Sequence, residues 1–258
     1  MPLFKSSNPV LGEKTFRNLG GGQYGGYGAI DASARMTVSG TVNKTAVLLL
    51  CVVATAAWTW NGFLANHDIS DIYGRLMIGC FGGLIVAFVT SFKPDWAPIT
   101  APIYALLEGM ALGGLSAMLD MRYHGIAIQA VSLTFGTMLA MLFLYRTGII
   151  RVTQKFRMGM FAAIGGIMLF YFAEIILGFF GIQFTTIEGA GPIGIVISLV
   201  IVTIAALNLV LNFDYIEQGA SAGAPKYMEW YCAFGLTVAL VWLYIEILNL
   251  LSKFNSRR

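Results

Sequence analysis

Four carboxylate side chains of this 258-residue chain lie within or at the end of long apolar stretches: Glu108, Glu174, Asp214 and Glu246. An ionised carboxylate is costly in hydrocarbon, so such residues face a bundle interior, find a partner or take up a proton. The ionised form also offers the oxygen ligands that a hard cation such as calcium prefers. The sequence therefore predicts either neutral, hydrogen-bonded carboxyls or a proton-sensitive cation site.

Cations that could neutralise these acids are absent from the middle of every apolar stretch. Arg75 and Lys93 fall near opposite ends of the second stretch. Two acids that share one site without a cation disfavour double ionisation, and such a pair can switch its proton count.

The composition sets the environment in which these acids act. Hydrophobic residues make up 57% of the chain and charged residues 11%, and the mean hydropathy is +0.75. Soluble domains are about 45–50% apolar and about 25% charged, so a soluble globule is excluded. A net charge of +3, scattered along the chain, gives no reason to expect a nucleic-acid partner. The partner that this composition predicts is the lipid bilayer.

Seven runs are long enough to cross a bilayer as helices, since a span needs about 20 apolar residues. They are Thr45–Ala65, Ile72–Phe92, Pro98–Leu119, Gly125–Tyr145, Met158–Gly181, Pro192–Phe213 and Glu229–Leu251. The runs show no period-two alternation, which disfavours a β-barrel. We predict an all-α, polytopic membrane protein with seven spans.

Three segments follow from these spans. Residues 1–44 contain glycine and tyrosine repeats and no apolar run, so we expect a flexible cytoplasmic tail; residues 45–252 form the membrane domain, and residues 253–258 form a short basic tail. Glycine pairs at Gly79/Gly83, Gly109/Gly113 and Gly165/Gly166 are expected to allow close helix packing.

The basic residues predict the orientation. We expect a protein of the plasma (inner) membrane whose N-terminus lies in the cytoplasm. The cytoplasmic segments then hold most of the basic residues: Lys5, Lys14, Arg17, Arg35, Lys44, Lys93, Arg146, Arg151, Lys155, Arg157 and Lys226. Excess Lys and Arg mark cytoplasmic loops. The last three basic residues, Lys253, Arg257 and Arg258, are the exception, because seven spans place them outside.

Enzyme-like motifs lack their partners. Gly219–Gly223 spells GxSxG, but a serine nucleophile needs a histidine base within reach, and His67 and His124 lie on the opposite side of the expected topology. We expect no enzyme activity, no catalytic residue and no bound cofactor.

Six stretches resemble the Bax inhibitor-1 family, specifically a bacterial branch with a long N-terminal tail. They are SNPVL (7–11), MTVSGTVNKT (36–45), YALLEGMALG (104–113), YRTGIIRVTQKF (145–156), LNFDYIEQG (211–219) and LVWLYIEILNLL (240–251). The resemblance implies seven helices with the last one central, and a pH-sensitive calcium leak in which calcium is the permeant ion.

The resemblance also implies site residues. A proton-sensing acid pair falls on Asp214 and Glu246, which are also the expected transient calcium contacts, and Lys93 is nearest to the position of the cation that latches the pair. Glu108 and Glu174 are secondary intramembrane acids. The pair can meet only if the seventh helix begins well outside the bilayer or the sixth continues past Asp214; otherwise Glu246 meets Glu108 or Glu174.

A second function stays open. In it the protein does not conduct, and its tail and bundle bind a membrane protease or another membrane protein. A leak in reconstituted liposomes separates the two hypotheses.

Overall fold

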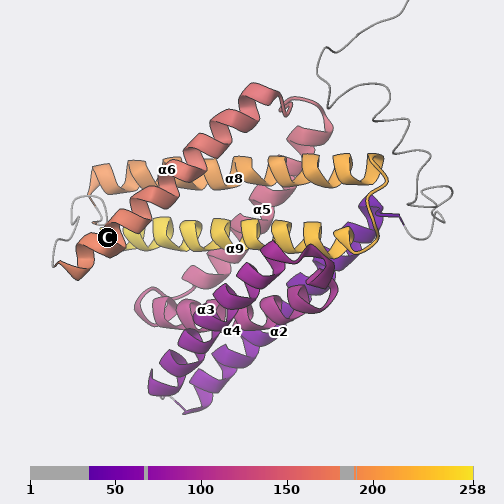
Figure 1. Ribbon diagram of the computed structural model, residues 1–258. Coiled ribbons are helices and arrows are strands. Elements are labelled where there is room, and N and C mark those ends of the chain that lie inside the picture. The colour runs from indigo at the N-terminus through magenta and orange to yellow at the C-terminus, as the bar shows by residue number, and fades with distance from the viewer. Residues whose placement is uncertain (1–34, 67–68, 181–188, 190, 258) are drawn as a thin grey trace, which may run out of the picture. The chain divides into compact units, whose positions relative to one another are not determined.

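The computed structural model describes residues 35–66, 69–180, 189 and 191–257 (Figure 1). The chain divides into two units, Met1–Arg35 and Met36–Arg258. The described part of the second unit is helical: α2 (Val38–Asn66), α3 (Ile69–Phe92), the 3-10 turn η2 (Pro94–Trp96), α4 (Ala97–Arg122), α5 (Ile126–Arg146), α6 (Gln154–Phe179), α8 (Pro192–Ser221) and α9 (Met228–Asn255). Seven of these helices are long and apolar enough to cross a membrane, which confirms the all-α, seven-span prediction.

Several helices are longer than their apolar runs. α2 begins at Val38 rather than at Thr45, so residues 38–44 belong to the bundle and not to a tail. α8 continues past Asp214 to Ser221, and α9 continues to Asn255, into the expected basic tail. Hydropathy marks only the apolar middle of a helix, whereas polar first and last turns extend it. The expected tail over residues 1–34 and the loop residue His67 lie outside the described residues.

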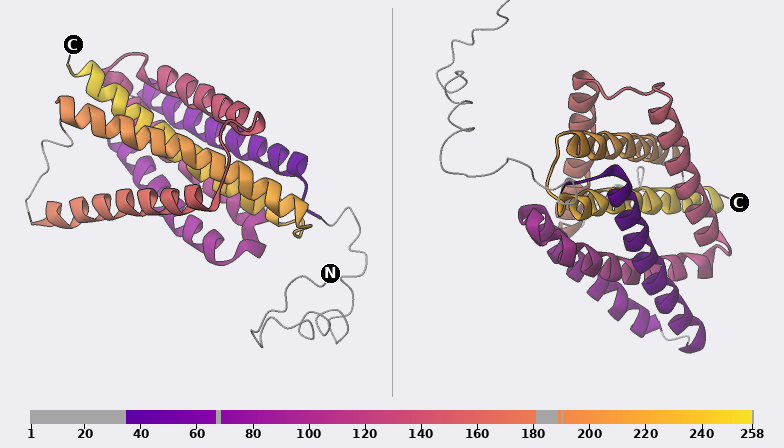
Figure 2. Two further views of the ribbon diagram at one scale, coloured as in Figure 1. Left: turned by 90° about the horizontal axis from the view of Figure 1, so that it is seen from above. Right: turned by 90° about the vertical axis from the view of Figure 1, so that its right-hand side faces the viewer.

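The last helix is central, as the resemblance implies. Of the candidate spans, α9 has the largest buried share, 61% against 6% for α6. It packs directly against α2, α4, α5 and α8. α3 packs mainly on α4, and α6 on α8. The resemblance implies six helices around the last one, whereas in the described part of the chain four helices pack closely against α9. Figure 2 shows α6 and α8 diverging toward the end at which α6 finishes.

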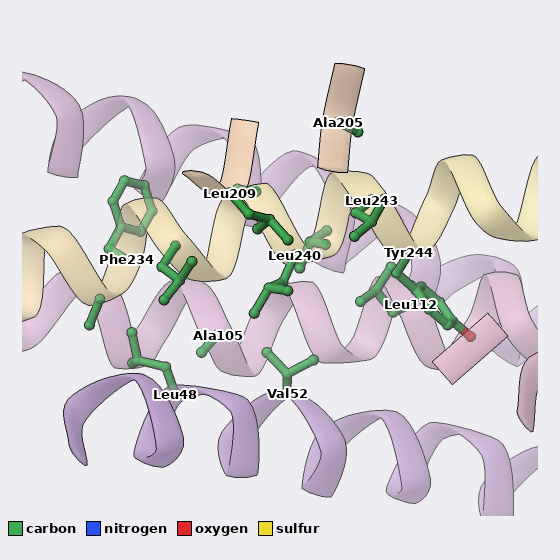
Figure 3. Packing of buried hydrophobic residues seen from close by; sticks show 14 of the residues in the cluster. Leu48, Val52, Ala105, Leu112, Ala205, Leu209, Phe234, Leu240, Leu243 and Tyr244 are labelled. Carbon is green, nitrogen blue, oxygen red and sulfur yellow. The ribbon is translucent and has the colours of Figure 1, made fainter. Parts of the chain in front are cut away.

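The core follows one face of α9. Leu240, Leu243 and Tyr244 of α9 pack with Leu48 and Val52 of α2 and with residues of α4 and α8 (Figure 3). Apolar burial gives little in lipid, so close shape matching and polar contacts must hold these helices together.

Glycines make the closest approaches. A Cβ on Gly79 would lie 2.6 Å from the backbone of Ala111, and one on Gly113 would lie 2.5 Å from the carbonyl oxygen of Ala56. These glycines therefore let α4 touch α3 and α2, as expected. The prediction for Gly165 and Gly166 is wrong, because a Cβ at either position would meet nothing within 4 Å.

We refer to the two ends of the bundle by one buried charged residue at each, Glu229 and Lys253. At the Glu229 end, α2, α6 and α9 begin and α8 finishes, and Thr37 donates to Glu229. At the Lys253 end, α9 finishes and α8 begins, and Lys253 donates to Ser198.

Candidate functional site

Asp214 is held by a cation from α6. Its carboxylate forms a salt bridge with Arg157 and accepts a hydrogen bond of 2.7 Å from Gln218, one turn further along α8. Arg157 is placed in the first turn of α6 because Thr153 caps that helix by accepting from the amide of Phe156. This pair connects α6 to α8 near the Glu229 end.

Glu246 is the most deeply buried acid of the four, at 3% exposure. Its Oε1 accepts from Tyr171 of α6 at 2.8 Å and from Trp242 of α9 at 3.0 Å. Its Oε2 is buried without a hydrogen-bond partner among the described residues. An ionised Glu246 would leave a charged oxygen without a donor, so a proton or a cation at Oε2 would stabilise the site.

Asp214 and Glu246 have separate partners instead of sharing a proton. Their contacts on α6, Arg157 and Tyr171, are about 21 Å apart along the helix axis. The reason lies in the antiparallel α8–α9 pair: Asp214 lies about two turns before the end of α8, whereas Glu246 lies about five turns after the start of α9. Continuation of α8 past Asp214 does not compensate for that offset.

The expected cation, Lys93, is exposed at the end of α3. Arg157 takes the role of the cation beside Asp214. The sequence indicated that Arg157 could be such a cation, because it lies among the basic residues just before the apolar run of α6. Only the packing of α6 on α8 shows which acid it faces.

The two secondary acids lie on different sides of the bundle. Glu108 of α4 faces α3, where its Oε2 would be 2.9 Å from a Cβ on Gly83. Glu174 of α6 lines a cavity of about 260 Å³ that Tyr171 and Lys253 also line. Tyr171 is thus a common neighbour of Glu246, to which it donates, and of Glu174, with which it lines this cavity. A direct contact between the two acids stays a prediction.

Lys253 was expected in a basic tail and is instead buried, at 8% exposure. Its ammonium group donates to Ser198 at 2.9 Å and to the carbonyl oxygen of Gly194 at 3.4 Å. A lysine at a helix end can turn its long side chain back along the helix. Lys253 lies in the last turn of α9, and that position gave no indication that its side chain would bind α8.

Three cavities follow one another along the α8–α9 pair, and α6 lines two of them. Their volumes are about 540, 400 and 260 Å³; the first two share Asn212, and the last two share Tyr171. We call this region the α6 groove and define it by Asn208, Asn212, Tyr215, Tyr171, Glu174 and Lys253. Its lining extends from Met228 to Lys253 of α9, about 37 Å of helix.

The polar groups of the α6 groove are amides, phenols, a carboxyl, a hydroxyl and the ammonium group of Lys253, and apolar side chains such as Phe161 and Leu211 lie among them. Trp242, which binds Glu246, lines the middle cavity. Among the residues that the structure describes, no group of three or more His, Cys, Asp or Glu side chains is arranged to hold a metal ion.

Sequence analysis did not single out Glu229 in the first turn of α9, which with Glu246 is one of the two buried acids among the described residues. Its side chain is fully buried and forms salt bridges with Lys44 of α2 and, at 2.9 Å, with Lys226. Thr37 donates both its backbone amide and its hydroxyl to Glu229 Oε1, each at 2.9 Å. A Cβ on Gly40 would overlap this carboxyl. The acid was taken for a span boundary because it begins the last apolar run.

These features together define a polytopic α-helical membrane protein with carboxyl groups inside its bundle. Residues 8–256 match the family described as Bax inhibitor 1 like, and the chain therefore belongs to that family. No curated protein and no solved structure matches the chain. The family membership expected from the six sequence stretches is confirmed.

Proposed function

We propose that this protein is a pH-sensitive leak pathway that conducts calcium along the α6 groove. The observation that supports this proposal is the run of adjoining cavities lined by Tyr171 and Trp242. Both residues donate to Glu246, whose second carboxyl oxygen is buried and accepts from no described residue. Calcium prefers carboxylate and amide oxygens. The length of the groove lining, about 37 Å, exceeds the hydrocarbon thickness of about 30 Å.

Asp214 and Glu246 have different roles in this proposal. Protonation of Asp214 removes its salt bridge with Arg157, which frees the start of α6 from α8 and opens the groove. Glu246 in its ionised form supplies oxygen ligands to the passing cation. The leak therefore rises as falling pH neutralises Asp214, while Glu246 is needed for conduction at any pH.

The test is calcium entry into liposomes that contain the full-length protein and a calcium-sensitive dye. Asp214→Asn should raise the leak at pH 7 and abolish its pH dependence. Glu246→Gln should lower the leak about tenfold, the effect of losing one charged ligand. Asp120→Asn is the matched control. Asp120 lies near the end of α4, where it accepts from the amide of Gly125, and it does not line the α6 groove.

A leak that responds neither to pH nor to these substitutions would refute the proposal. Silent liposomes under all conditions would favour the second function, in which the protein binds a membrane protease or another membrane protein without conducting.

For the orientation, we propose that the Glu229 end faces the cytoplasm of the plasma (inner) membrane. Lys93, Arg146, Arg151, Lys155 and Lys226 lie in the turns or helix ends expected on that side, and such an excess marks cytoplasmic loops. Burial of Lys253 removes one of the three basic residues that opposed this orientation. A cysteine introduced at Arg151 should react with a membrane-impermeant maleimide only in inside-out vesicles.

A further inference from the structure

A further cavity lies on another side of the bundle, between α2 and α5. Its volume is about 340 Å³, and its walls include Val42 and Leu49 of α2 and Met138 and Leu142 of α5. Among the described residues, α2 and α5 share no packed interface. The cavity is therefore a break in the bundle wall that faces the lipid.

The back of this cavity is formed by core residues. Phe213 and Ile216 of α8 and Leu236 of α9 line it, and each is at most 9% exposed. An apolar chain that entered between α2 and α5 would contact the bundle interior, not just its outer surface. This distinguishes the cavity from the shallow grooves that any lipid-facing helix pair presents.

The depth of the cavity matches one lipid leaflet. Its lining on α2 runs from Val38 to Leu49, which is about 16 Å of helix, and on α5 from Arg146 back to Met138, about 12 Å. Half of the hydrocarbon core of a bilayer is about 15 Å thick. One acyl chain of the leaflet at the Glu229 end would fill this length.

The mouth of the cavity carries one charge of each sign. Arg146 is exposed, and its guanidinium group forms no salt bridge with another described residue. Glu217 is exposed too and accepts a hydrogen bond from Tyr145. A guanidinium group binds a phosphate through two parallel hydrogen bonds, and a carboxylate accepts from a primary ammonium group.

We propose that this cavity binds a phosphatidylethanolamine molecule, with an acyl chain between α2 and α5, its phosphate on Arg146 and its ammonium group on Glu217. An anionic headgroup would face Glu217 without compensation. A choline headgroup carries no N–H to donate to it. The site is separate from the α6 groove, so the proposal does not depend on conduction.

The test is native mass spectrometry of the full-length protein after exchange into detergent that contains phosphatidylethanolamine, phosphatidylcholine or phosphatidylglycerol with identical acyl chains. The wild-type protein should retain one phosphatidylethanolamine, and about tenfold less of the other two lipids, the effect of one charge-assisted hydrogen bond. Arg146→Ala and Glu217→Gln should each remove this preference.

A third variant tests the acyl-chain part of the site. Ala46→Trp places an indole in the cavity that Ala46 lines and should abolish the retained lipid. Ile85→Trp, on the lipid-facing side of α3 at 61% exposure, is the matched control and should retain it. A thermal unfolding curve like that of the wild type shows that each variant is folded.

Two results would overturn the proposal. One is equal retention of the three lipids by the wild-type protein, or a preference for phosphatidylglycerol. The other is unchanged retention in Ala46→Trp or Arg146→Ala, which would mean that the bound lipid is annular and lies elsewhere on the bundle.

Discussion

Removal of the Glu229 carboxylate is the sharpest test of how the Glu229 end is held together. In Glu229→Ala, Lys44 and Lys226 lose their salt bridges, and Thr37 loses the acceptor for both its amide and its hydroxyl. Since these donors come from the start of α2 and from the α8–α9 turn, one substitution disconnects two segments from α9.

The expected loss of stability follows from the two lysines that Glu229→Ala leaves without a partner carboxylate. Breaking a buried ion pair by removing one partner costs about 3–5 kcal/mol. The lower limit applies here, because Lys44 and Lys226 are 19% and 48% exposed and can turn to water. A loss of about 3 kcal/mol corresponds to a fall in Tm of about 6–12 °C for a domain of this size. Glu229→Gln keeps an acceptor for Thr37 and should fall between Glu229→Ala and the wild type.

The assay is thermal unfolding in a mild detergent, followed by far-UV circular dichroism. Glu217→Ala is the control: it removes an exposed carboxylate from the same end of the bundle, where Tyr145 is its partner, and should lower the Tm by less than about 4 °C. If both variants fell by the same small amount, the Glu229 contacts would not stabilise the bundle, and our reasoning would be refuted.

Two further predictions concern helix packing and use the same unfolding assay. Gly113→Ala should destabilise the bundle by about 1–3 kcal/mol, because its Cβ would lie 2.8 Å from Ala56 Cα and would force α2 and α4 apart. Gly166→Ala is the control: its Cβ meets no neighbour within 4 Å, so the variant should be neutral or stabilising. Equal losses of stability in the two variants would contradict the packing of α2 on α4. Tyr244→Phe removes the buried hydrogen bond of 2.7 Å to Ser116 and should cost about 1 kcal/mol, whereas an unchanged Tm would show that Ser116 finds another partner.

The sequence by itself determined the class, the spans and the family. Each of these depends on local properties: the length of an apolar run, the cost of exposing backbone groups to lipid, and stretches such as LNFDYIEQG that read the same in any fold. It also identified Glu246 and Glu174 as acids that need an explanation, because burial of a carboxylate is recognisable from its apolar neighbours alone.

Only the tertiary structure decided which groups meet. Asp214 faces Arg157 instead of Lys93, Glu246 faces Tyr171 instead of Asp214, and Lys253 turns inward to α8. These partners depend on the rotation and axial offset of whole helices against one another. A shift of about three residues along a helix axis, about 5 Å, exchanges one partner for another without changing any apolar run, so the sequence pattern alone leaves the pairing undetermined.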